Sequence, residues 1–431
     1  MQKALEILKN AKSFGSTGRE IIINKYKLEG KMKKLGLLPR LIIGITLGII
    51  VGLIMNKTQS NIVTKMLGAV IGTYTSLFGN LLKFTVPLII LGLITPGIAD
   101  LGKKAGKMLT FTTALAYISS IIAGFFAYGV GKILIPMLLH GIDARKLTGE
   151  IKTETIFNSV VPLDLGQIMG AMTAIALAFV IGLGLAYSKE ETLKNIVFEF
   201  KDIVEKFLNK VIIPFIPFHI AGLFAKLAGD GAIVPVIQVF SVLFAMLIVL
   251  QILCILAQYT VACIYGKKPY FKSIKNMLPA YLTAIGTQSS AATIPVTLEA
   301  TGKNGISDDV KDFVIPLCAN IHLAGDMITL TLGAMGILYL FSPVGATIPL
   351  ALGIQYVLLL GVAMVAAPGI PGGGVMTALG LLGSLLGMTS PQQALMIALH
   401  FSQDSFGTAT NVTGDGAIAI IVDERNKRIS N

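Results

Sequence analysis

Runs of mainly apolar residues, each long enough for a helix to cross a membrane, recur along most of the chain. A hydrocarbon core about 30 Å thick needs roughly 20 such residues per helix. Of the 431 residues, 54% are hydrophobic and 13% are charged, whereas soluble domains carry roughly 25% charged residues. The sequence therefore predicts an all-α polytopic membrane protein. The first six predicted spans are 38–55, 70–98, 108–139, 165–187, 203–228 and 234–265.

Positive charge is concentrated at the start of the chain. Residues 1–40 contain 10 Lys and Arg but only 3 Asp and Glu. Because cytoplasmic segments are enriched in Lys and Arg, we expect 1–37 and the short basic end, 424–431, to be cytoplasmic, with the protein in the cell membrane. The segment 1–37 either rests on anionic lipid or is a solvated tail. Basic residues do not recur with aromatics along a domain-sized face, which argues against a nucleic-acid partner.

Two apolar segments near the C-terminal end are interrupted by polar or Gly/Pro residues. The segment 273–303 is broken at Thr-Gln-Ser-Ser, 287–290, and the segment 349–388 at a Gly/Pro-rich stretch, 367–374. Such backbone at membrane depth needs protein or a water-filled cavity to satisfy it, and paired interrupted segments indicate a transporter site. The sequence predicts two re-entrant helical hairpins, with two kinked helices as the alternative.

Each predicted hairpin is followed by a predicted continuous helix with polar residues in an apolar run. In the last helix, 391–422, four polar residues spaced four, three and four apart lie on one helical face. A carboxylate at the bilayer centre costs at least about 2.5 kcal/mol. We therefore expect a cationic partner (an ammonium group, Na⁺ or H⁺), with an interhelical hydrogen-bond seam as the alternative. These four residues are Asp404, Thr408, Asn411 and Asp415.

The preceding helix, 307–341, carries His322 and Asp326 four residues apart, again predicted on one face. Histidine titrates near neutrality, so a role in proton coupling is open. The other three histidines, His140, His219 and His400, are predicted to lie at interfaces or in packing. The 287–290 tip offers hydroxyls and helix N–H groups that suit a carboxylate.

Three motifs resemble the dicarboxylate/amino acid:cation symporters, the glutamate-transporter family. The run Thr-Gln-Ser-Ser-Ala-Ala-Thr-Ile-Pro, 287–295, resembles that family's first hairpin, and Gly-Ile-Pro-Gly-Gly-Gly, 369–374, its second hairpin tip. Asn-Val-Thr-Gly-Asp, 411–415, matches the signature of its last helix. The resemblance implies eight transmembrane helices plus two re-entrant hairpins in a homotrimer that works as an elevator. It also implies that the first six helices, 38–265, are mostly scaffold and that 266–423 forms the transport core.

Carried over by position, the resemblance implies that Asp404 binds the substrate amino group and Asn411 the α-carboxylate. It also implies a Na⁺ ligand at Asp415 and a second Na⁺ at carbonyls near 366–367. No other cofactor is expected. The predicted substrate-binding residues are Gln288, Ser289, Ser290, Asp326, Gly369, Ile370, Gly374, Asp404, Gly407, Thr408 and Asn411. The predicted ion-coupling residues are Asn411, Asp415, His322, Ala366 and Ala367.

Several positions depart from the family pattern. Where acidic-substrate members carry an arginine, this chain has Gly407 and Gln288, which favours a neutral substrate. The family's Asn-Met-Asp-Gly-Thr is replaced by His-Leu-Ala-Gly-Asp, 322–326. These replacements imply that fewer Na⁺ ions bind than in the family pattern, or that H⁺ takes the place of one Na⁺.

The sequence thus predicts a secondary active symporter that imports a small neutral amino acid, similar to the serine/threonine branch. Transport would be coupled to Na⁺, and coupling to H⁺ is an open alternative. The first alternative is a symporter for dicarboxylates or acidic amino acids. A substrate-gated channel is an alternative of another class. We expect no enzyme, because no nucleophile–base motif accompanies Ser290.

Overall fold

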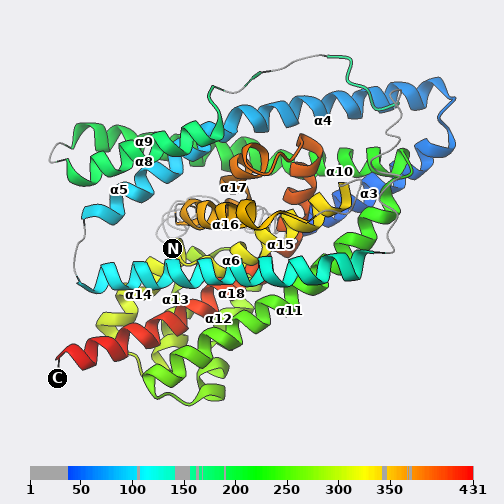
Figure 1. Ribbon diagram of the computed structural model, residues 1–431. Helices are drawn as coiled ribbons and strands as arrows, with labels where there is room; N and C mark the ends of the chain where they lie inside the picture. The colour runs from blue at the N-terminus through cyan, green and yellow to red at the C-terminus, as the bar shows by residue number, and fades with distance from the viewer. Residues whose placement is uncertain are drawn as a thin grey trace, which may run out of the picture.

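The computed structural model describes residues 37–103, 107–140, 156–161, 165–166, 168–188, 191–341, 347–365, 367 and 371–430. Within them all regular structure is helical, and no strand occurs (Figure 1). The predictions for the basic segment 1–37 fall almost wholly outside these residues. The helices of the first half are α3 (Leu37–Lys57), α4 (Ile62–Ile89), α5 (Thr95–Lys103), α6 (Lys107–Leu139), α8 (Ala171–Tyr187), α9 (Thr192–Phe207), α10 (Ile213–Gly229) and α11 (Ile233–Gly266).

Six helical stretches of the described chain are long and apolar enough to cross a membrane, which confirms a membrane-spanning helical protein. Single π-helical turns, Ile90–Ile94 and Leu208–Ile212, join α4 to α5 and α9 to α10 without ending the helix. Three predicted boundaries were wrong. The second span begins earlier, at Ile62, and the fifth at Thr192, because polar residues there continue the helix rather than end it. The fourth predicted span, 165–187, is helical only from Ala171, since Gly170 is extended.

The two interrupted segments are each a pair of helices that contact each other. The first pair is α12 (Tyr270–Thr287) and α13 (Ser290–Gly302), and the second is α16 (Leu350–Met364) and α17 (Gly373–Ser384). Non-helical backbone separates the members of each pair at the predicted polar or glycine-rich stretch. Within the described residues, each interrupted segment therefore consists of two helices in contact with each other, and we refer to the two pairs as the first and the second hairpin.

The predicted continuous helix 307–341 is wrong. It is divided into α14 (Asp308–Ile321) and α15 (Ala324–Phe341), with His322 in an extended conformation. Two backbone N–H groups released by the break find side-chain acceptors on other helices. Leu323 N donates to Ser120 Oγ at 3.2 Å and Gly325 N to Asn411 Oδ1 at 2.7 Å. Partners from other helices thus stabilise a break that the local sequence does not indicate.

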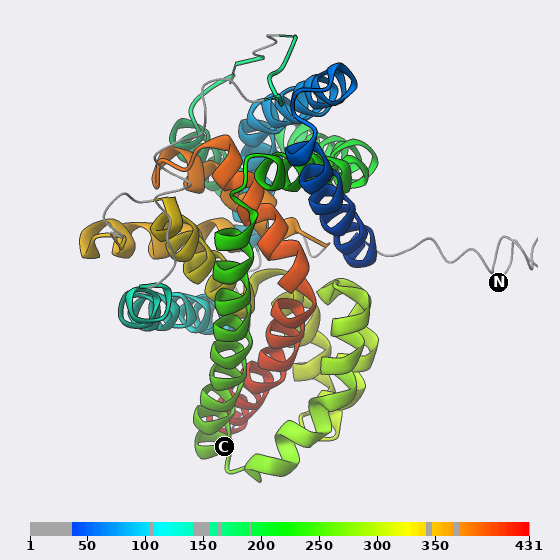
Figure 2. The same ribbon diagram turned by 90° about the vertical axis from the view of Figure 1, so that its right-hand side faces the viewer.

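The last helix, α18 (Ser390–Ser430), runs through the middle of the molecule. It contacts α11, α12, α14 and α15. Figures 1 and 2 show α4, α8 and α9 at one end of the molecule and α12, α13 and α14 at the other. The hairpins and the broken helix therefore converge on α18.

Candidate functional site

The polar stripe predicted on the last helix lies on α18 and is buried. Relative exposures are 6% for Asp404, 5% for Thr408, 2% for Asn411 and 1% for Asp415. Their partners on other elements include Gly372 before α17, Asp326 of α15 and His322 between α14 and α15. Two buried carboxylates on one helix need compensating partners.

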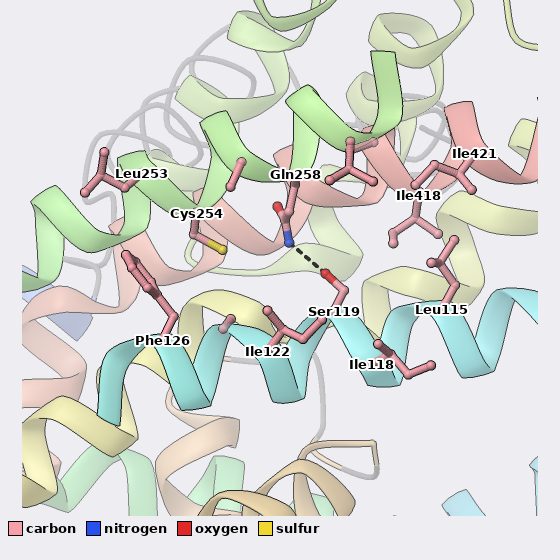
Figure 3. A pocket seen from close by; sticks show the side chains of 14 residues that line it. Leu115, Ile118, Ser119, Ile122, Phe126, Leu253, Cys254, Gln258, Ile418 and Ile421 are labelled. Atoms are coloured by element: carbon pink, nitrogen blue, oxygen red, sulfur yellow. Dashed lines mark hydrogen bonds between the residues drawn. The ribbon is translucent and has the colours of Figure 1, made fainter. Parts of the chain in front are cut away.

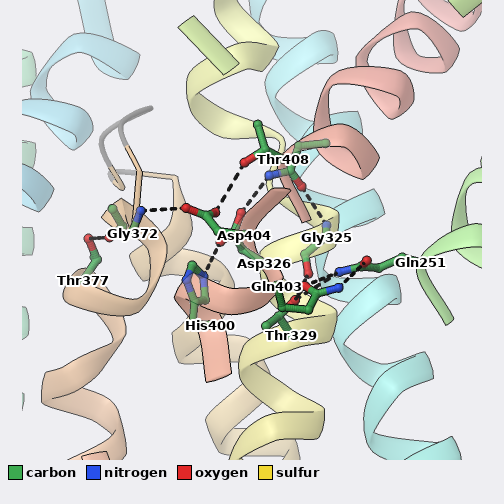
Figure 4. Close-up of polar contacts among 12 residues, drawn as sticks. Gln251, Gly325, Asp326, Thr329, Gly372, Thr377, His400, Gln403, Asp404 and Thr408 are labelled. Atoms are coloured by element: carbon green, nitrogen blue, oxygen red, sulfur yellow. Dashed lines mark hydrogen bonds and ion pairs between the residues drawn. The ribbon is translucent and has the colours of Figure 1, made fainter. Parts of the chain in front are cut away.

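Asp404 is held by the second hairpin and by its own helix (Figure 4). The backbone N–H of Gly372 donates to Asp404 Oδ2 at 2.8 Å, and Thr408 Oγ1 donates to Oδ1 at 3.3 Å. Gly372 has a φ of +75°, a left-handed conformation that favours glycine. The glycine-rich tip thus brings a backbone donor directly onto the carboxylate.

Asp326, at the start of α15, makes a second buried cluster next to Asp404. His400 Nε2 lies 2.8 Å from Asp326 Oδ1, and Asn411 Nδ2 donates to Oδ2 at 2.7 Å. His400 is 1% exposed. The prediction that His400 lies at an interface or in packing did not include this contact with Asp326. The position of His400 four residues before Asp404 was the available signal, because that spacing places both on one face of α18.

His322 belongs to a different cluster, around Asp415. His322 Nδ1 lies 2.9 Å from Asp415 Oδ1, and His322 Nε2 lies 3.0 Å from Ser119 Oγ. Gln258 Nε2 donates to Ser119 Oγ at 3.0 Å. The predicted shared face of His322 and Asp326 does not exist, because the break between α14 and α15 separates them. Asp415 Oδ2 is buried and has no hydrogen-bond partner among the described residues.

The tip of the first hairpin contacts α18 through Gln288. Its backbone is left-handed, with a φ of +53°, and its Nε2 donates to Ser405 Oγ at 3.0 Å. Ser289 caps α13 by accepting from Ala292 N at 3.3 Å, and Ser290 is buried in its first turn. A left-handed non-glycine residue is a strained conformation, of the kind that clusters at functional sites.

Gly407 lies where α15 and α18 approach closely. A Cβ built on Gly325 would be 2.2 Å from the Gly407 carbonyl oxygen. Beside Gly407, a buried network joins three helices: Gln251 Nε2 donates to Thr329 Oγ1 at 3.1 Å and to Gln403 Oε1 at 3.0 Å. Sequence reasoning missed this network, since no spacing connects residues of three separate helices.

The remaining predicted site residues divide into two groups. Gly374 lies against Asp326 and His400, and Ala367 is buried with its N–H donating to Met364 O at 3.1 Å. Ala366, Gly369 and Ile370 lie outside the described residues.

Two features of the site suit a cation. The ligating atoms of Asp326, His400 and Asp404 all lie within 4.8 Å of one another, and all three residues are buried. The sequence has no Lys or Arg in 324–341, 373–384 or 390–424. The partners that these segments and the adjoining Gly372 supply to the carboxylates are thus an imidazole, N–H groups and a hydroxyl.

A cavity of about 300 Å³ lies between α6 and α11, next to the His322 cluster (Figure 3). Its lining is apolar except for Ser119 and Gln258, whose hydrogen bond crosses it. The other lining residues named in the figure include Phe126, Leu253 and Ile418. None of the residues of the polar cluster around Asp404 lines this cavity.

Buried ionisable residues on an inner helix, met by broken helices and hairpins, define a membrane transporter. Residues 37–425 match the model of the sodium:dicarboxylate symporter family. The chain belongs to that family. It is a transporter and not an enzyme, and the family implies sodium-coupled symport of dicarboxylates or amino acids, with Na⁺ as the coupling ion.

Proposed function

We propose that this symporter imports a small neutral amino acid, with serine and threonine as model substrates. The observation that carries the proposal is the charge of the site. Asp404 and Asp326 are both buried carboxylates, and the adjoining segments 324–341, 373–384 and 390–424 contain no Lys or Arg. A substrate with a side-chain carboxylate would add another negative charge without a fixed countercharge, which is costly in a buried site.

In this proposal the substrate's α-ammonium group binds Asp404, and Asn411, Thr408 and the start of α13 at Ser290 face its carboxylate. The Gly372 N–H now occupies Asp404 Oδ2. A bound ammonium group would donate to the same carboxylate that the second hairpin contacts, so substrate binding and the position of that hairpin would be linked. Gly374 would then lie against the ligand, and the roles of Gly369 and Ile370 stay predictions from the sequence.

We propose that Na⁺ binds beside Asp415. Asp415 Oδ2 is buried and has no hydrogen-bond partner among the described residues, which supports this assignment. A buried carboxylate oxygen without a hydrogen bond is costly unless a cation binds it. Asn411 and the carbonyls of Ala366 and Ala367 are the other proposed ion ligands. The other oxygen, Asp415 Oδ1, already contacts His322 Nδ1. This contact favours fewer bound Na⁺ ions than the family pattern would give, with H⁺ as the alternative coupling ion.

We further propose a homotrimer in the cell membrane with both termini cytoplasmic. The core 266–423 would move through a scaffold formed mainly by the first six helices. Cross-linking and mass measurement in detergent test the trimer.

Uptake into proteoliposomes tests the function. Labelled serine, threonine, alanine, aspartate and succinate are offered under separately imposed Na⁺ and H⁺ gradients. We expect saturable, Na⁺-driven uptake of serine or threonine, which Asp404→Asn reduces by about a hundredfold or more, since it removes a buried charged hydrogen bond. Uptake confined to aspartate or succinate would favour the acidic-substrate alternative. Current that does not saturate with substrate would favour the channel.

A further inference from the structure

The chain turns from α11 into α12 at the end of the molecule that also carries the C-terminal end of α18 (Figure 2). Four lysines lie in this turn and in the first two turns of α12, whereas residues 231–298 contain no Asp or Glu. These lysines are Lys267, Lys268, Lys272 and Lys275. The turn therefore carries a concentrated positive charge that its own segment does not balance.

Other basic residues at this end of the molecule already have partners. Four of them pair with an acid three or four residues away along the chain: Lys303–Glu299, Lys311–Asp308, Lys427–Asp423 and Arg428–Glu424. Arg425 lies over the ring of Phe111, 4.0 Å from its centroid.

Within the turn itself, one lysine is engaged and three are not. Lys268 Nζ donates to the Gly305 carbonyl oxygen at 3.1 Å. Lys267, Lys272 and Lys275 are exposed and have no ion pair or hydrogen bond with the described residues. Three ammonium groups thus remain available to a ligand of opposite charge.

The surroundings of these three lysines are apolar and exposed. α11 is long and apolar enough to cross a membrane and ends at Gly266, directly before Lys267. On α12, Phe271 is 83% exposed and shares a face with Lys275 and Leu278, since the three are spaced four and three apart. The exposed apolar side chains next to the turn are Val261, Ile264, Phe271, Leu278 and Leu282. Lysine and aromatic side chains beside exposed apolar ones are typical of the boundary between hydrocarbon and water.

We propose that Lys267, Lys272 and Lys275, together with Phe271, form a binding surface for the phosphate headgroups of anionic lipids. The three ammonium groups complement a headgroup with a net negative charge, and the ring of Phe271 enters the boundary with the acyl chains. This surface belongs to the first arm of the first hairpin, so a bound lipid holds that arm at the membrane surface. The inference does not depend on which substrate is transported.

Tryptophan fluorescence tests this surface. The chain contains no tryptophan, so Phe271→Trp supplies a single reporter at an exposed position. The full-length variant is reconstituted into phosphatidylcholine vesicles that contain brominated phosphatidylglycerol or, in a separate sample, brominated phosphatidylcholine at the same mole fraction. Bromine on the acyl chains quenches only a nearby indole ring, so the quenching reports which lipid lies at the reporter. We expect phosphatidylglycerol to be enriched there at least about fivefold, and the enrichment to fall at high salt.

Charge variants assign the enrichment to the lysines. On the Phe271→Trp background, a triple variant with Lys267→Gln, Lys272→Gln and Lys275→Gln should reduce the enrichment to about twofold or less. The matched control removes the same number of charges from exposed lysines of α4, α9 and the π-helical turn after α9, by Lys65→Gln, Lys206→Gln and Lys210→Gln. It should leave the enrichment unchanged, because these lysines are not on α11 or α12 and salt screens charges over about 10 Å.

Four results would overturn the inference. A reporter quenched by neither brominated lipid shows that water or protein, and not lipid, covers the turn. Equal quenching by both lipids shows contact without recognition of the headgroup charge. An enrichment that the triple lysine variant retains assigns the recognition to other residues. Soluble glycerol phosphate that removes the enrichment at matched ionic strength assigns the lysines to a soluble anion instead of a lipid.

Discussion

At the scale of single residues, the two carboxylates of α18 have different surroundings. Both oxygens of Asp404 accept hydrogen bonds, from Gly372 N and Thr408 Oγ1. Asp415 has His322 at one oxygen and no partner, among the described residues, at the other. Residues of the same type on the same helix face can therefore serve different ligands, which is why we propose an ammonium group for one and an ion for the other.

We expect Asp415→Asn to weaken Na⁺ coupling. The substitution removes a buried negative charge that would otherwise attract the ion, so the Na⁺ concentration for half-maximal uptake should rise at least about tenfold. Serine uptake measured over a Na⁺ series checks this. Thr331→Val is the control and should leave the Na⁺ dependence as it is, because the buried Thr331 hydroxyl has no partner among the described residues. An Asp415→Asn protein with the parent Na⁺ dependence would contradict the ion assignment.

We expect Gly407→Arg to add aspartate to the substrates. A Cβ at this position would have no atom closer than 3.7 Å, the nearest being Gln251 Nε2 and Gln403 Oε1. The added guanidinium would supply the countercharge that the site lacks. Aspartate uptake is the measurement, with Gly407→Gln as an uncharged control. Equal gains in aspartate uptake in both variants would show that the charge at this position does not set the preference for a neutral substrate.

At the scale of helices, the broken element α14–α15 depends on α18 and α6 for its shape. Ser120 of α6 and Asn411 of α18 accept the N–H groups of Leu323 and Gly325. The break also brings α15 so close to α18 that Gly325 faces the Gly407 carbonyl. The close helix contact and the site are thus parts of one arrangement.

We expect Gly325→Ala to destabilise the protein by about 1–3 kcal/mol, because the new methyl group would overlap the backbone of α18. Thermal unfolding in detergent checks this. Gly333→Ala is the matched control on the same helix. Its Cβ would meet the ends of two side chains, Met396 and Leu399, rather than backbone. Equal losses of thermal stability in the two variants would contradict backbone overlap as the cause.

At the scale of the whole molecule, the end of α18 beyond its predicted span, 391–422, contacts two other elements. Asp423 Oδ1 accepts from Ser307 N at 3.2 Å and from Ser307 Oγ at 2.5 Å, at the start of α14. Arg428 donates to Tyr265 O of α11 at 3.0 Å. The helix that carries the polar stripe is thereby attached to its neighbours at this end.

Asp423 gives this attachment a pH dependence. Burial opposes ionisation of the carboxyl, but hydrogen bonds from Lys427 and Ser307 outweigh it and hold the pKa below its ordinary value. The ionised group therefore contributes stability above the unfolded pKa of about 3.9, and that contribution is lost as the pH falls through the lower folded pKa.

We expect Asp423→Asn to lower stability at neutral pH by about 1–2 kcal/mol, since it weakens a helix cap and an ion pair. The difference from the parent should shrink as the pH falls below about 4. Thermal unfolding over a pH series checks both points. Glu424→Gln, which removes only the neighbouring pair with Arg428, should have the smaller effect. A deficit that persists undiminished at low pH would contradict the assignment to the charge.

The sequence by itself determined the helical membrane class, the places where the segments 273–303 and 349–388 are interrupted, and the polar face of α18. Each of these depends on local properties: the length of an apolar run, a Gly/Pro or polar interruption, and helical spacing within one element. They could be predicted because no distant residue is needed to produce them.

Only the tertiary structure decided the break at His322, the place of His400 in the site and the Gln251–Gln403–Thr329 network. In each case the deciding group comes from another helix, such as Ser120 for the break or Asp326 for His400. A buried polar group is stable only where its partner lies. Sequence spacing along one helix gives no information about a partner on another, and that is the physical reason for the difference.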